Sequence, residues 1–158
     1  MVTDALHSVT TQDEVNLILA DSTKLIATDI NWLPDPDHPP ALRFRVPVIS
    51  AQEVLLKIQG RWNPKAGKLS YILLHPGLGR IYALDMGVEH RNPTGGCIRD
   101  VHKHTWTDRY RDAMAYVPLD ITATWDQPVE VWRQFCAEAN IRHDGTLATP
   151  HWQEELRL

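Results

Sequence analysis

Four runs of residues rich in apolar and β-branched side chains constrain the fold more than any other feature. They cover residues 42–48, 54–60, 68–75 and 80–86. In the first run, apolar residues alternate with polar ones, which is typical of a strand with one buried face. Turn-forming residues separate the later runs, at 63–67 and 76–79. Because a parallel return needs a crossover of roughly a dozen residues, these short connections predict an antiparallel meander.

Two helices are predicted, one before and one after the strand region. Thr11 and Glu14 have the spacing of a capping box, which predicts a helix over residues 12–21. Asp126 as the cap and Pro128 in the first turn open the second helix. The residues that share one face of this second helix are Val131, Phe135 and Ala139. This apolar stripe predicts packing against the core.

The remaining strands and the fold class follow from the same reading. Residues 24–32, 97–106 and 113–118 are further candidate strands. A chain of 158 residues has the length of one ordinary domain. We therefore expect a single α+β domain over residues 1–158. Its antiparallel meander sheet of about five strands should be flanked by an N-terminal and a C-terminal helix.

Composition narrows the classes of protein to which the chain can belong. The formal net charge of −4 argues against a nonspecific DNA-binding protein. Two cysteines, Cys97 and Cys136, are too few for a disulfide framework or a zinc ribbon. No apolar segment approaches the roughly 20 residues of a membrane span, and the N-terminus has no signal-peptide pattern. The sequence thus predicts a cytoplasmic protein without a membrane partner.

The richest chemistry lies at His102 and His104. Side chains two residues apart point to the same side of a strand, so this pair is expected to share one sheet face within about 7 Å. The turn-rich segment 90–96 should fold back and bring His90 near the pair. Two Arg and two Asp residues follow within 108–112.

Two catalytic interpretations of the pair compete. In the first, His102 and His104 act as general base and acid in RNA cleavage, with Arg109 and Arg111 stabilising the charged phosphate. This chemistry needs no metal and no cofactor. In the second interpretation, the pair and a third ligand, either His90 or Asp108, hold a divalent metal. An H-x-H spacing is common in such sites, but it is weak support by itself.

A third interpretation is not catalytic. Trp106, Trp62 and Tyr110, together with the nearby arginines, could form a surface that binds a peptide or a nucleic acid. In this reading His90, Trp106 and Tyr110 are binding residues, and the histidines form part of an exposed patch.

Several short motifs in order resemble an uncharacterised family of small bacterial proteins. They are the H-x-N-P motif at 90–93, the H-x-H-aromatic motif at 102–106, the A-aromatic-x-P/L motif at 115–118, and a C-terminal helix ending near Asn140-Ile141. The resemblance covers about residues 68–142. It implies a phage, mobile-element or defence context, and a distant similarity to small toxins of toxin–antitoxin pairs. The residues it marks as a site are His90, His102 and His104.

The combined expectation is a partner- or nucleic-acid-binding module of a mobile-element or defence system, centred on a histidine surface site. The alternative is a metal-independent ribonuclease toxin. The expected partners are a small antitoxin-like protein or RNA, and a homodimer is compatible with both functions.

Overall fold

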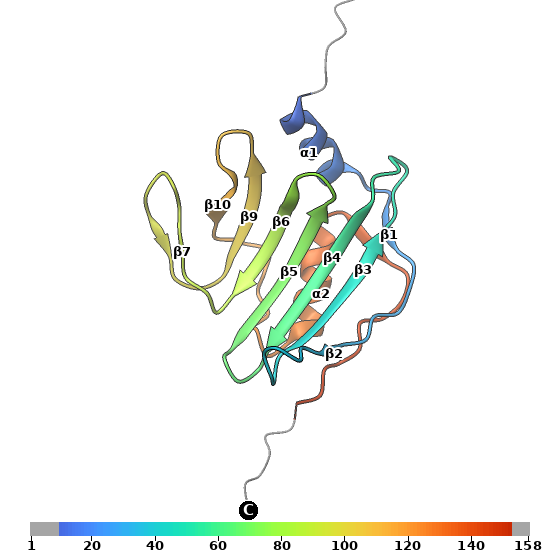
Figure 1. Cartoon of the computed structure of the whole chain (residues 1–158), viewed down its shortest axis with the longest axis vertical. Helices are drawn as coiled ribbons and strands as arrows, with labels where there is room; N and C mark the ends of the chain where they lie inside the picture. Colours follow the sequence, from blue (N-terminus) through green and yellow to red (C-terminus); the bar gives the residue numbers. More distant parts are fainter. Residues whose placement is uncertain (1–9, 153–158) are drawn as a thin grey trace, which may run out of the picture.

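An antiparallel sheet of seven strands is the centre of the structure, a computed structural model that describes residues 10–152 (Figure 1). Its strand order is β10-β9-β6-β5-β4-β3-β2. The strands are β2 (Leu33–Pro34), β3 (Leu42–Val48), β4 (Leu56–Asn63), β5 (Lys68–His75), β6 (Gly79–Met86), β9 (His102–Thr107) and β10 (Arg111–Tyr116). Short turns join β3 to β6 in an antiparallel series, as predicted.

The expected count of about five strands is too low. The proline-rich segment before β3 contributes β2, which pairs with β3 at the edge of the sheet. Proline is tolerated there because an edge strand has one side that needs no ladder hydrogen bonds. The candidate strand at 97–106 is also divided, into β8 (Cys97–Ile98) and β9. The Asp100 side chain between them accepts a hydrogen bond from the Gly87 backbone N–H (2.9 Å) and interrupts the strand.

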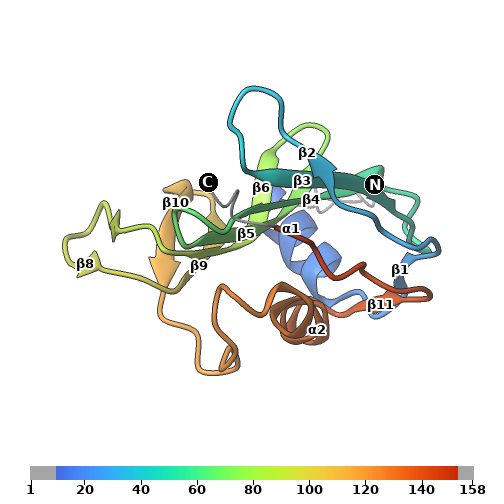
Figure 2. The same ribbon diagram turned by 90° about the horizontal axis from the view of Figure 1, so that it is seen from below.

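The other elements lie to one side of the sheet or beyond its end (Figure 2). They are α1 (Thr11–Ala20), β1 (Lys24–Ile26), α2 (Pro128–Glu138), β11 (Ile141–His143) and the hairpin of β7 (His90–Arg91) with β8. Helix α2 runs beneath the sheet, whereas α1 lies at one end of it, so the two helices do not flank the sheet as expected (Figures 1 and 2). Neither described helix is long and apolar enough to cross a membrane.

Both helix starts differ by one residue from the prediction. The capping box of α1 is formed by Thr10 and Asp13, whose side chains and backbone N–H groups bond reciprocally. The sequence contains two overlapping patterns of hydroxyl and acid, and the earlier one is used. In α2 the N-cap is Gln127, without a side-chain cap, because Asp126 instead accepts a hydrogen bond from Thr124 Oγ1.

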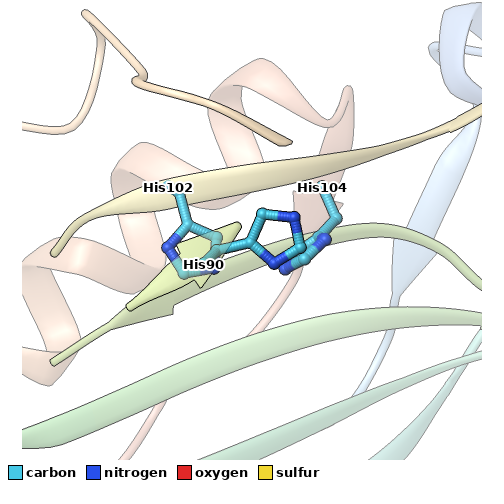
Figure 3. Close-up of side chains that lie close together, drawn as sticks. All are labelled: His90, His102 and His104. Carbon is cyan, nitrogen blue, oxygen red and sulfur yellow. The ribbon is translucent and has the colours of Figure 1, made fainter. Parts of the chain in front are cut away.

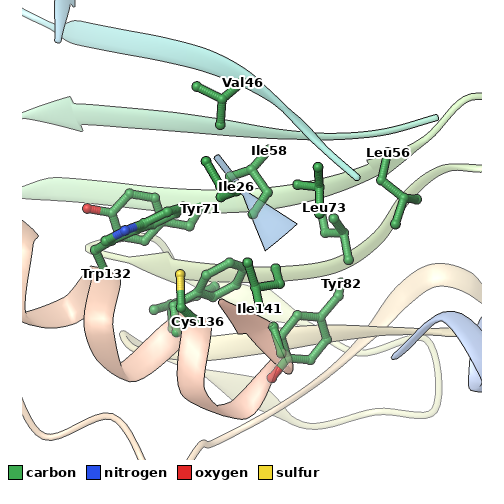
Figure 4. Packing of buried hydrophobic residues seen from close by; sticks show 14 of the residues in the cluster. Ile26, Val46, Leu56, Ile58, Tyr71, Leu73, Tyr82, Trp132, Cys136 and Ile141 are labelled. Carbon is green, nitrogen blue, oxygen red and sulfur yellow. The ribbon is translucent and has the colours of Figure 1, made fainter. Parts of the chain in front are cut away.

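The apolar core fills the space between the sheet and α2 (Figure 4). Val131, Phe135 and Ala139 are buried, which confirms the predicted stripe. Tyr71 on β5 packs against Phe135 with a ring separation of 5.7 Å, and its hydroxyl donates to the Pro128 carbonyl (2.6 Å). These contacts hold α2 against the middle of the sheet and leave the opposite sheet face without a helix.

Candidate functional site

His102 and His104 lie on β9 and point to the same sheet face, as predicted. Their ring centroids are 4.9 Å apart. Only 1% of His102 and 3% of His104 is exposed, so the expectation of a histidine surface site is wrong for this pair. The pair is covered because β10 and the β7–β8 hairpin carry further groups over it.

His90 joins the pair from the β7–β8 hairpin, which confirms the predicted fold-back (Figure 3). Its ring centroid is 5.3 Å from that of His102 and 4.7 Å from that of His104. Asn92 anchors the hairpin, because its side-chain amide accepts from the Ala115 N–H (2.8 Å) and donates to the Ala115 carbonyl (2.9 Å). The amide thus covers the free edge of β10 much as a neighbouring strand would.

One nitrogen of each imidazole faces a backbone carbonyl. His102 Nδ1 lies 2.8 Å from the Asp100 carbonyl oxygen, and His104 Nδ1 lies 2.9 Å from that of Asp112. His90 Nε2 lies 2.8 Å from the carbonyl oxygen of Ala113. Because a carbonyl only accepts, each of these nitrogens carries a proton. In the neutral ring, the other nitrogen then has a free lone pair.

The three rings also lie close to one another. One ring nitrogen from each of His90, His102 and His104 lies within 4.8 Å of the other two. His102 and His104 direct Nε2 to the same point, the carboxylate of Asp85. Three imidazoles that converge, each oriented through its outer nitrogen, have the arrangement found around bound metal ions.

Asp85 is the functional residue that the sequence interpretation missed. It lies on β6 directly opposite His102, and its Oδ2 is 3.0 Å from His104 Nε2 and 3.5 Å from His102 Nε2. The only signal in the sequence is a carboxylate within the mainly apolar stretch of residues 81–86 in β6. That signal could not identify a partner, because the pairing of β6 with β9 skips the β7–β8 hairpin.

Asp85 and the neighbouring histidines change each other's pKa. Burial alone would raise the pKa of Asp85, but hydrogen bonds from His102 and His104 outweigh it and hold this pKa well below its usual value. Burial alone would lower the pKa of His102, but the contacts with Asp85 and the Asp100 carbonyl raise it. Asp85 is therefore ionised, and it favours either a protonated imidazole or another cation beside it.

The arginine next to this group is Arg80, not Arg109 or Arg111. Arg80 Nη1 lies 3.7 Å from Asp85 Oδ2, and its Nε donates to Asp112 (3.0 Å). Arg111 lies over the Trp106 ring at 5.2 Å, and Arg109 lies over the Tyr110 ring at 5.1 Å. The predicted catalytic arginines thus pack on aromatic rings in and beside the β9–β10 turn.

The predicted aromatic binding surface is not formed. Trp106 is 2% exposed and Trp62 is 7% exposed, and both belong to the core. Tyr110 is half-buried next to Arg109. Asp108, the other candidate third ligand, lies in the turn after β9, where its backbone N–H donates to Gln12 (3.0 Å).

Asp85 connects the histidine cluster to solvent. Its side chain is 16% exposed, and it lines a cavity of about 380 Å³ on the sheet face opposite α2. The cluster therefore has the features of a metal centre or an acid–base centre, and Asp85 lies between it and the cavity.

Comparison with known proteins gives a family but no activity. No curated protein and no solved structure matches the chain. Residues 11–141 match the model of DUF6978, a family of unknown function. This match includes both helices, the whole sheet and the histidine cluster. The chain belongs to the DUF6978 family.

Proposed function

We propose that this protein binds a divalent transition metal, with zinc the best suited, through His90, His102 and His104. The observation that supports this most strongly is that each imidazole has one nitrogen facing a backbone carbonyl, and that the three rings can each offer one nitrogen within 4.8 Å of the others. Metal-binding histidines commonly have such an outer hydrogen bond, which selects the tautomer. Imidazole is also a preferred zinc ligand.

The same centre supports hydrolytic chemistry. A zinc ion held by three neutral imidazoles would keep its double positive charge, and it would lower the pKa of a bound water to about 7. Asp85 lies beside two of the three ligands and borders the cavity. It would therefore accept a hydrogen bond from such a water, while Arg80 balances the charge of the carboxylate.

Metal content tests the proposal directly. The protein is stripped with a chelator, dialysed and titrated with Co²⁺, whose visible absorption reports tetrahedral coordination by nitrogen and oxygen. We expect one equivalent to bind. His90→Ala should weaken binding by more than about 100-fold, beyond the roughly 10–100-fold typical of losing an outer-shell partner.

His75→Ala is the matched control. The Nε2 atom of His75 lies 3.1 Å from Glu14 Oε1, and this pair is not part of the cluster. His90 is preferred to the buried pair for the first test, because its hairpin lies outside the main sheet. Circular dichroism of each metal-free variant shows whether it is folded. Failure of the folded wild-type protein to bind Co²⁺ or Zn²⁺, or an equal loss in His75→Ala, would refute the proposal.

A second candidate, metal-independent RNA cleavage, has one observation in its favour. Asp85 contacts the Nε2 atoms of both His102 and His104, as in a dyad that stabilises a protonated imidazole. Acid–base catalysis would persist in EDTA and would fall roughly 10²–10⁴-fold in His104→Ala. Cleavage that a chelator abolishes would instead support the metal centre. A binding module without activity would show neither result.

A further inference from the structure

The cavity next to Asp85 has a basic lining on its other side. It lies on the sheet face opposite α2, at the ends of β4, β5 and β6. Its polar lining consists of His38, Arg61, Asn63, Lys68, Ser70 and Asp85. A volume of about 380 Å³ is within the usual range for a small-molecule site, about 300–1,000 Å³.

Strand register explains why these groups meet. Arg61 pairs with Ser70, Ser70 pairs with Asp85, and Asp85 pairs with His102, so the four residues form one row across the sheet. Directly paired residues point to the same face. Neighbouring strands are about 4.8 Å apart, so Arg61 and Asp85 are separated by roughly 10 Å along this row. Ser70 lies between them at the floor of the cavity.

The charges in the row favour an anion at the Arg61 end. Asp35 is the carboxylate next to Arg61 (3.4 Å), but it also lies near Arg43 (3.8 Å) and His38 (3.4 Å). One carboxylate therefore faces two guanidinium groups, and Lys68 adds an exposed cation nearby. Asp85, at the other end of the row, lies near Arg80 (3.7 Å), which also pairs with Asp112 (3.0 Å). The two cations that line the cavity, Arg61 and Lys68, thus lie at the end away from Asp85.

We propose that this cavity binds the phosphate or carboxylate group of a small molecule between Arg61 and Lys68, and so holds the rest of that molecule next to Asp85. The planar guanidinium group suits two-point binding of either oxyanion, and the lysine adds a point charge. Only the idea that the bound molecule lies next to a metal depends on the proposed function. The anion site itself requires no metal.

The first experiment uses metal-free protein and two anions of different class. Inorganic phosphate and succinate are titrated separately, and binding is followed by calorimetry and by amide chemical shifts. We expect saturable binding of one of them, weakened more than tenfold by Arg61→Gln and severalfold by Lys68→Gln. The anion that binds more tightly shows whether the group is phosphate or carboxylate.

Arg45→Gln is the matched control, because Arg45 lies on the same sheet face, bonds Gln59 (2.8 Å) and does not line the cavity. It should leave anion affinity unchanged. Absence of saturable binding of both anions, or an equal loss in Arg45→Gln, would overturn the proposal. If the Arg61→Gln variant does not fold, Lys68→Gln alone tests the site. Lys68 is exposed at the turn between β4 and β5, so its substitution should not disturb folding.

A second experiment separates this proposal from the metal centre. The bound anion should change the visible spectrum of Co²⁺-loaded wild-type protein, and the change should be absent in Arg61→Gln. If the anion binds metal-free protein with the expected dependence but no Co²⁺ binds, the anion site stands and the metal centre fails. If Co²⁺ binds but no anion does, only the anion site fails.

Discussion

The two faces of the sheet bury their side chains by different physical means. On the face towards α2, aromatic and aliphatic residues such as Tyr71 and Phe135 interlock in a dry core. On the opposite face, polar groups from β4, β5, β6 and β9 form a row from Arg61 to His102. The first face is stabilised by removal of apolar surface from water, whereas the second depends on charge compensation.

Strand β9 shows the contrast within three consecutive residues. His102 and His104 point to the sheet face opposite α2. Lys103 between them points to the α2 side, where it pairs with Asp120 (2.7 Å) and Glu138. All three are buried. The lysine has fixed carboxylate partners, so its charge is satisfied within the fold. The two histidines instead share one carboxylate, that of Asp85. This carboxylate favours a cation beside it, either a proton on an imidazole or a metal ion.

The largest expected effect is a core truncation. Phe135→Ala removes a fully buried ring and should lower the free energy of unfolding by about 3–5 kcal/mol, because it leaves a cavity among Tyr71, Tyr82 and Trp132. Denaturant unfolding of metal-free protein measures this loss. Affinity for Co²⁺ should stay within a fewfold of wild type while the protein is folded. A much larger change in Co²⁺ affinity would show that the two faces are not independent.

Removal of the metal is the next largest effect. At a free zinc concentration about 100 times the dissociation constant, binding adds about 2.7 kcal/mol to the free energy of unfolding, and a chelator should remove that amount. Thermal unfolding with and without chelator measures it. The increment should be the same in Phe135→Ala and absent in His104→Ala. An increment that survives in His104→Ala would place the metal elsewhere.

A backbone contact on the core side should have an intermediate effect. A Cβ at Gly60 would lie 2.2 Å from the Phe44 ring, so Gly60→Ala should cost about 1–3 kcal/mol through overpacking. Urea unfolding at a fixed chelator concentration measures the change. Like Phe135→Ala, this variant should keep its metal affinity. An unchanged midpoint would mean that Phe44 can move aside at no cost.

The smallest effect on stability is expected at the β7–β8 hairpin. Asn92→Ala removes two hydrogen bonds to Ala115 and should cost about 1 kcal/mol. It should nevertheless weaken Co²⁺ binding about tenfold, because Asn92 orients the hairpin that carries His90. Thr94→Ala on the same hairpin is the control and should change neither quantity. Equal metal affinity in Asn92→Ala and wild type would remove the hairpin from the site.

Much of this organisation could be predicted from local patterns. The alternation in β3, the short turns after β4 and β5, and the stripe on α2 each depend on a few neighbouring residues. The shared direction of His102 and His104 is equally local, because the strand repeat of two sets it. The positions of strand ends and helix caps are predicted less accurately, because competing hydrogen bonds of Asp100 and Asp126 decide them.

The composition of the site was decided by tertiary structure. Asp85 contacts His102 and His104 because β6 pairs with β9 across an inserted hairpin, a choice that no local pattern records. Burial was decided in the same way, since Trp106 is part of the core although its sequence neighbours resemble a binding surface. The sequence by itself determined which side chains share a strand face. Which strands became neighbours, and so which charges met, depended on how the whole sheet buried its apolar side.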